Sequence, residues 1–249
     1  MINRRFGLLL PEIDPDDPDM LKSFAKRDDR LERLDTGDYT AAEYVLWQDE
    51  MRRVNRLLGD ARALRLSMHS DLSGTNGGRI SILDVGAGSG ELLKTAIGLV
   101  GTRPGFFVGA EINAEAARSI RDTRVMSSVQ CDALRLPFGD DSFDFAVSSL
   151  FLHHLANEKA VTLIKEMNRV ARRRFIVIDL HRHAAAFYLY RTFAPWFLQR
   201  FTVDDGSLSI RRSFLPWELK DLAVAAGIDN VVVERRAAFR LVLSGSKNP

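Results

Sequence analysis

Short apolar runs alternate with helical patterns through most of the chain. The runs at 80–85, 106–112, 128–131, 143–150 and 175–178 are rich in branched and aromatic side chains, as in strands buried on both faces. Helical patterns follow at 91–100, from 114 and from 157. This alternation predicts an α/β fold with a parallel sheet. The last two runs, at 231–234 and 239–243, are predicted to form two further strands.

Another amphipathic stretch precedes this alternation. Tyr44, Trp47, Met51, Val54 and Leu58 recur at three- and four-residue intervals and predict a helix over 41–58 that ends at Gly59. We divide the chain into an N-terminal helical cap segment, residues 1–62, and a domain of residues 63–249. The helix could cover a ligand cleft or pack on the outside of the sheet, and the pattern leaves both open.

Residues 80–92, with the sequence ISILDVGAGSGEL, predict a strand, a glycine turn and the start of a helix. Gly86, Gly88 and Gly90 would let the chain bend sharply and a ligand lie against its backbone. The spacing is neither the G-x-G-x-x-G of dinucleotide sites nor a phosphate-binding P-loop. Asp84, two residues before the first glycine, suits an ammonium group better than a phosphate.

The stretch 83–90 resembles the first motif of class I S-adenosylmethionine-dependent methyltransferases. The resemblance implies a Rossmann-like, doubly wound, seven-stranded sheet, S-adenosylmethionine as cofactor, S-adenosylhomocysteine as product, and no metal. Pro137-Phe138 followed by residues 140–144 is typical of the small-molecule branch, the ubiquinone-biosynthesis-like and polyketide-tailoring enzymes. By this resemblance Glu111 binds the ribose and Asp132 the adenine amine. The cofactor-binding residues it implies are Asp84, Gly86, Ala87, Gly88, Gly90, Glu111, Ile112, Asp132, Ala133, Ser149 and Leu150.

Two histidines follow the fourth predicted strand, at the edge where ligands of open parallel sheets bind. Histidine can accept a proton near neutral pH. By resemblance to aromatic O-methyltransferases, His153 is the candidate catalytic base and His154 the second candidate, while a packing role stays open. Asn157 is expected to cap the next helix, and Arg172 to Arg174 to end it.

Residues 184–214 form the most individual segment of the chain. Its predicted helices carry aromatic and other apolar side chains on all sides, with cationic residues between them, so we expect a lid inserted after strand five. The candidate substrate-binding residues are His181, Tyr188, Arg191 and Trp196. Packing of this segment against the N-terminal helix is the alternative.

Composition adds few constraints. The 249 residues are 46% hydrophobic, and 35 basic against 33 acidic residues give a net charge of +2, so no global field indicates nucleic acid or a membrane surface. The single cysteine, Cys131, favours a cytoplasmic location, and no apolar segment reaches the roughly 18 residues of a membrane span.

The sequence thus predicts O-methylation of a small hydrophobic phenol, quinol or carboxylic acid, in the biosynthesis of a quinone or a secondary metabolite. Two alternatives stay open. One is an RNA or protein methyltransferase that uses the arginines near 172 and 211, and the other is a non-catalytic protein that binds S-adenosylmethionine.

Overall fold

A computed structural model describes residues 24–73, 78–123 and 125–247, and these contain a seven-stranded sheet. The strands are β1 (Ile80–Val85), β2 (Gly105–Glu111), β3 (Ser127–Gln130), β4 (Phe143–Ser149), β5 (Ala171–Leu180), β6 (Val231–Arg236) and β7 (Arg240–Ser246). Their order is β3-β2-β1-β4-β5-β7-β6. Neighbours among β1 to β5 pair in parallel, and β7 is antiparallel to both β5 and β6. The predicted doubly wound sheet is confirmed.

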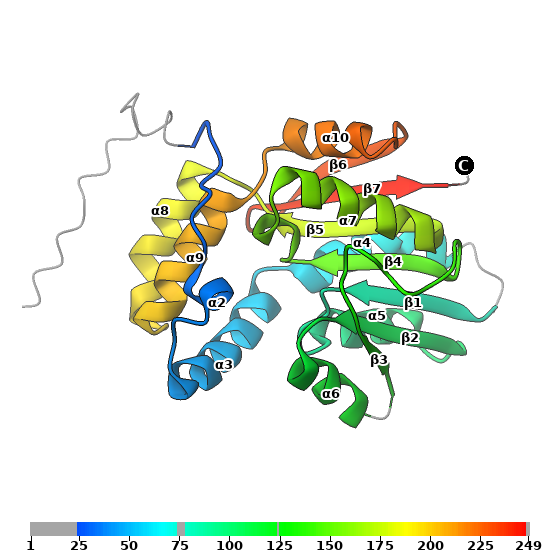
Figure 1. The fold of residues 1–249 in the computed structure, drawn as a ribbon, viewed down its shortest axis with the longest axis horizontal. Helices are drawn as coiled ribbons and strands as arrows, with labels where there is room; N and C mark the ends of the chain where they lie inside the picture. Colours follow the sequence, from blue (N-terminus) through cyan, green and yellow to red (C-terminus); the bar gives the residue numbers. More distant parts are fainter. Residues whose placement is uncertain (1–23, 74–77, 124, 248–249) are drawn as a thin grey trace, which may run out of the picture.

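Helices cover both faces of the sheet (Figure 1). One face packs on α4 (Asp60–Ser73), α5 (Glu91–Val100) and α6 (Ala114–Asp122), and the other on α7 (Asn157–Val170) and α10 (Pro216–Ala225). The strand side chains alternate between the two cores: Ile82 lies under α4 and α5, whereas Leu83 lies under α7. Burial on both faces explains why the strands read as continuous apolar runs.

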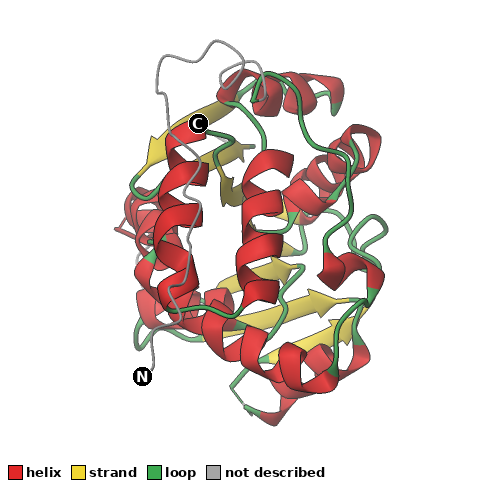
Figure 2. Ribbon diagram, turned by 90° about the vertical axis from the view of Figure 1, so that its left-hand side faces the viewer, coloured by secondary structure: helices red, strands yellow, loops and turns green. Residues whose placement is uncertain are grey.

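A helical layer lies at the carboxyl ends of the parallel strands, where their arrowheads point in Figure 1. It contains α2 (Arg33–Thr36), α3 (Ala41–Leu57), α8 (Ala184–Phe193) and α9 (Arg200–Arg212), the last two running side by side (Figure 2). The N-terminal helix α3 and the insertion pack on each other, since the rings of Trp47 in α3 and Phe201 in α9 have centroids 6.5 Å apart. Glu50 of α3 also accepts hydrogen bonds from Gln199 N and the Thr202 hydroxyl.

Two local predictions are wrong. Arg172 to Arg174 lie in β5 and do not end α7, because Arg172 pairs with Asp144 of β4 at 2.7 Å and Arg174 donates to Ser246 of β7 at 2.9 Å. Asn157 is the first residue of α7 and not its cap; its side chain accepts from Arg27 instead.

The expected boundary between the N-terminal segment and the domain does not fall between two helices. The hydrophobic pattern predicts no helix directly after Gly59, yet α4 begins at Asp60 and packs on α5, so the expected boundary after residue 62 falls within this helix. Residues 1–23 of the expected cap segment lie outside the described residues. Among the described residues, no helix combines the length and apolar character needed to cross a membrane.

Candidate active site

The glycine turn after β1 has the backbone its sequence predicts. Gly86 and Gly88 have φ of +70° and +50°, in the left-handed region that favours glycine. A Cβ at position 86 would lie 2.7 Å from Cγ of Phe151, whereas a Cβ at 88 would have nothing within 4 Å. The turn is therefore closed by a ring on one side and open at Gly88.

Glu111, at the end of β2, is held against this turn. Its carboxylate accepts from the backbone N–H of Gly88 at 2.8 Å and from that of Asn113 at 2.9 Å. Asn113 itself caps α6, as its side chain accepts from Glu115 N and Ala116 N. The two acceptor roles of Glu111 fix its carboxylate beside the glycines, which suits a ligand with a vicinal diol.

Two buried polar atoms below the turn have no hydrogen-bond partner among the described residues: Asp84 Oδ2 and Ser149 Oγ. Their strands, β1 and β4, are neighbours in the sheet. Asp84 is 1% exposed, and burial, with the nearby charge of Glu111, raises the pKa of its carboxyl to about 7. Buried groups without partners are rare, so these atoms indicate that the site receives a polar ligand.

The remaining cofactor candidates lie at the same edge of the sheet. Asp132 follows β3 and accepts from Leu134 N at 2.9 Å, Ala133 is nearly buried, and Ile112 is 68% exposed. Leu150 follows β4 with φ of +51°, a strained conformation for a non-glycine residue, and its N–H donates to Ile178 O. The structure thus brings the predicted residues to one edge, and their contacts with a ligand stay a prediction.

The first candidate base, His153, is held by a buried carboxylate. Asp179, at the end of β5, accepts from the backbone N–H of His153 at 2.9 Å and pairs with its Nδ1 at 2.6 Å. Burial opposes the ionised form of Asp179, but the charge and hydrogen bonds of His153 outweigh it and lower the pKa of this carboxyl. An ionised Asp179 can only accept, so Nδ1 of His153 carries a proton, and Nε2 is the ring nitrogen left to bind a proton or a ligand.

His153 is 3% exposed because an N-terminal strap, residues 24–38, covers it. Glu32 of the strap places its Oε1 3.9 Å from His153 Nε2 and also 3.9 Å from His154 Nδ1. His154 is less buried, and its Nδ1 lies 2.9 Å from Oδ1 of Asp35. Neither acid was predicted from the sequence; a charged segment that precedes the domain gives no signal of where it docks.

Arginines from distant parts of the chain fasten the strap. Arg182 is buried and donates to Phe24 O at 2.8 Å and Ala25 O at 3.2 Å. Arg27 donates to the carbonyls of His153 and Arg212, at 3.1 and 2.6 Å. These bonds satisfy backbone oxygens of both the strap and the sheet edge, so the strap is part of the fold.

The four candidate substrate residues do not form one cluster. His181 is buried, and burial together with His183 lowers its pKa to about 4. Tyr188 lies beside Phe24 of the strap, with ring centroids 6.5 Å apart. Arg191 pairs with Asp204 at 3.4 Å, and Trp196 is 69% exposed, so both side chains lie at the surface of the insertion. Their roles stay predictions.

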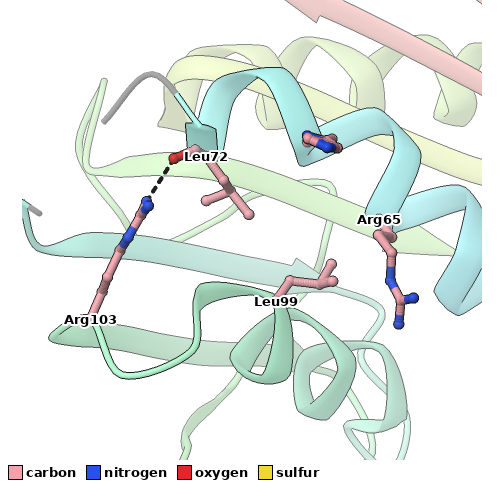
Figure 3. Close-up of a pocket in the computed structure, with 5 residues that line it drawn as sticks. Arg65, Leu72, Leu99 and Arg103 are labelled. Atoms are coloured by element: carbon pink, nitrogen blue, oxygen red, sulfur yellow. Dashed lines mark hydrogen bonds between the residues drawn. The ribbon is translucent and has the colours of Figure 1, made fainter. Parts of the chain in front are cut away.

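Two cavities lie apart from the glycine turn. One of about 510 Å³ lies along the strap and is lined in part by Asp28, His154 and Arg212. The other, of about 240 Å³, lies between α4 and α5 and is lined by Arg65, His69, Leu72, Leu99 and Arg103 (Figure 3). Its wall includes a hydrogen bond from Arg103 Nη1 to Leu72 O at 2.7 Å. Leu72 and Arg103 lead into the amino ends of β1 and β2, opposite the candidate site.

Known proteins are similar to this chain in sequence and in fold. Residues 83–178 match the family described as "Methyltransferase domain". The ubiquinone/menaquinone biosynthesis C-methyltransferase UbiE of Burkholderia mallei (strain SAVP1) is 30% identical over 168 residues, which cover 60% of this chain and 68% of that protein. With the sheet order and the glycine turn, these matches show that the chain belongs to the class I S-adenosylmethionine-dependent methyltransferases. It is an enzyme, and its cofactor is S-adenosylmethionine.

Two further proteins are similar over different shares of the chain. The 2-phytyl-1,4-naphtoquinone methyltransferase of Synechocystis sp. is 35% identical over 49% of this chain, and the match spans only 53% of that protein. A crystal structure of an S-adenosylmethionine-dependent methyltransferase from Aquifex aeolicus has a TM-score of 0.55 at 18% identity, covering 76% of this chain and 90% of that one. This last likeness shows the fold alone.

Proposed function

We propose that the enzyme methylates an oxygen of a small hydrophobic acceptor that carries a phenol, a quinol or a carboxylic acid. The Asp179–His153 pair is the observation that carries this proposal. It fixes the imidazole through Nδ1, so that Nε2 is the nitrogen available to accept a proton at the carboxyl edge of the sheet, and these acceptors each have a proton to lose.

The chain's own residues would hold the cofactor by complementary charge and hydrogen bonding. We assign Asp84 to its ammonium group, Glu111 to the ribose hydroxyls and Asp132 to the adenine amine. When bound, the cofactor supplies a methyl group attached to a positively charged sulfur. The open space beyond Gly88 and the unpartnered Asp84 Oδ2 support this assignment.

In the proton transfer, the acceptor O–H bond breaks and the proton moves to His153 Nε2. Asp179 then stabilises the resulting imidazolium, since its carboxylate already accepts from Nδ1 at 2.6 Å. Glu32 covers Nε2 in this structure, so the strap must move aside before an acceptor can reach it.

The surroundings favour a small aromatic acceptor. Tyr44 of α3 stacks between Tyr39 and Trp47, and its pKa is raised by burial, by Tyr39 and by the charges of Glu115 and Glu111, which supports an aromatic row in the neighbourhood of the cofactor candidates. A nucleic-acid substrate fits less well, because Arg172 pairs with Asp144 and Arg211 with Asp28. Those cations are already used within the protein.

Carbon methylation of a quinol is the second candidate, and the printed name of the similar UbiE enzyme favours it. It needs the same first step, because the phenolate form makes a ring carbon nucleophilic. The two reactions differ in the atom that forms the new bond to the methyl carbon.

The test is turnover of hydrophobic phenols, quinols and aryl carboxylic acids, with products identified by mass spectrometry and NMR. His153→Ala should lower kcat by about 10²–10⁴-fold while calorimetry shows unchanged S-adenosylmethionine binding. His154→Ala is the matched comparison and should lose less. Wild-type turnover by His153→Ala would refute the base assignment, and methyl groups found only on ring carbon would replace the first candidate by the second.

A further inference from the structure

Glu32, His153 and His154 form a cluster that the methyl-transfer reaction does not account for. One carboxylate oxygen and one ring nitrogen from each histidine lie within 4.8 Å of one another. Glu32 comes from the strap, and the two histidines lie in a short 3₁₀ turn after β4. The side chains of Glu32 and His153 are 4% and 3% exposed, so water contributes little to satisfying them.

Nε2 of His153 and Oε1 of Glu32 face each other in this cluster. His153 Nδ1 is bonded to Asp179, so Nε2 is the nitrogen left to bind a proton or a cation. Glu32 Oε1 lies 3.9 Å from that nitrogen and is buried without a hydrogen-bond donor among the described residues. When Glu32 is ionised and His153 is neutral, these two atoms repel each other, and a cation bound between them removes the repulsion.

A carboxylate that orients one histidine of a metal site is already present. Asp179 orients His153 through Nδ1 and leaves Nε2 for an ion, and carboxylates bonded to ligating histidines in this way are usual around bound zinc. Nδ1 of His154, the nitrogen 3.9 Å from Glu32, is hydrogen-bonded to Asp35 at 2.9 Å, so it has to give up this bond to bind an ion. Arg212 opposes a cation, since its Nη1 is 3.6 Å from Glu32 Oε1. Three carboxylates nevertheless surround the cluster, and Arg212 donates its hydrogen bonds to Asp35 and to the carbonyl of His154.

We infer that this cluster binds one divalent transition-metal ion of the zinc class, with Glu32, His153 and His154 as ligands. Two histidines and one glutamate are an established zinc ligand set. Tetrahedral zinc holds its ligand atoms about 3.3 Å apart, so Glu32 Oε1 has to approach each nitrogen by roughly half an ångström. The cavity of about 510 Å³ that His154 lines offers the ion a path to the site and space for a fourth ligand.

The ion would join the strap to the end of β4. It would also occupy His153 Nε2, the atom that accepts the proton in our proposed function, so zinc should inhibit methyl transfer; this clause alone rests on the proposed function. Metal binding therefore tests the metal site, and turnover in the presence of zinc tests the role of His153 as the base.

The experiment treats the full chain with a chelator, dialyses it, and titrates Zn²⁺ alone by calorimetry, with metal content measured by mass spectrometry. Co²⁺ serves as a spectroscopic probe of nitrogen ligation. Glu32→Gln and His154→Ala test the ligands, and Asp179→Asn tests the orienting carboxylate. Glu115→Gln and His69→Ala, which change exposed residues outside the cluster, are the matched controls.

We expect one zinc per chain, a Kd raised at least tenfold in Glu32→Gln and His154→Ala, a 10–100-fold rise in Asp179→Asn, and no change in the controls. Stoichiometry far below one, or equal affinity in wild type and both ligand variants, would overturn the site. Zinc that binds at this site without inhibiting turnover would instead overturn His153 as the base and leave the metal site standing.

Discussion

Alanine replacements at Gly86 and Gly88 separate two demands that the glycine turn satisfies. Both residues have left-handed φ, so each alanine costs about 1–2 kcal/mol of backbone strain. At position 86 the added Cβ also meets the Phe151 ring at 2.7 Å, whereas at 88 it meets nothing within 4 Å. We expect Gly86→Ala to lower the free energy of unfolding by about 1–3 kcal/mol more than Gly88→Ala, the usual range for overpacking.

Cofactor affinity should follow the opposite order. The cofactor would approach the protein backbone at the open side of Gly88. A methyl group there would therefore obstruct the ligand without disturbing the fold. We expect Gly88→Ala to weaken S-adenosylmethionine binding at least tenfold, about 1.4 kcal/mol, beyond any loss in Gly227→Ala. Gly227 is the control because it has φ of +78° with nothing within 4 Å.

Urea unfolding followed by circular dichroism gives the stabilities, and calorimetry gives the affinities. Adding Phe151→Ala to Gly86→Ala removes the ring that the new Cβ meets, and the double-mutant cycle should show a coupling of about 0.5–3 kcal/mol. Equal destabilisation by the two alanines, additive effects in the cycle, or wild-type affinity in Gly88→Ala would each refute this reasoning.

Two further predictions concern buried charges. Arg182→Met removes a buried guanidinium that bonds Phe24 O and Glu218, and should lower the free energy of unfolding, measured in urea, by about 3–5 kcal/mol. The control Arg200→Met, at an exposed site, should change it by no more than about 0.5 kcal/mol. Similar changes in both variants would contradict this prediction. Burial and Glu111 raise the pKa of Asp84 from 3.8 to about 7, so its stabilising contribution is complete below pH 3.8 and is lost as pH rises to 7, by at most about 1.4 kcal/mol per pH unit. Urea titrations from about pH 4.5 to 8 should show this slope in wild type and not in Asp84→Asn, and parallel curves would contradict it.

The sheet and the cofactor side of the site were predictable because their signals are local. Continuous apolar runs mark strands buried on both faces, and the glycines of the turn have the positive φ that their spacing predicted. Asn113 lies directly before α6 and caps it, which is a local signal of the same kind. Each of these features depends on neighbours within a few residues.

The acceptor side was less predictable because it depends on pairs far apart in the chain. Asp179 was visible at the end of the fifth strand, but its bond to His153, 26 positions earlier, was not. Three consecutive arginines fit a helix end as well as a strand, and only the ion pair of Arg172 with Asp144 decides between them. Glu32 could not be connected to either histidine without the fold.

The strap also sets an order of events during synthesis. Phe24 leaves the ribosome 158 residues before Arg182, the residue that fastens it, and at roughly 5–20 residues per second this delay is about 8–30 s. The delay is longer for Arg27, because the carbonyl of Arg212 to which it donates is synthesised 185 positions later. The first described residues of the nascent chain are therefore among the last to reach their native contacts, and a chain interrupted before α9 is complete lacks the partners that hold the strap over His153.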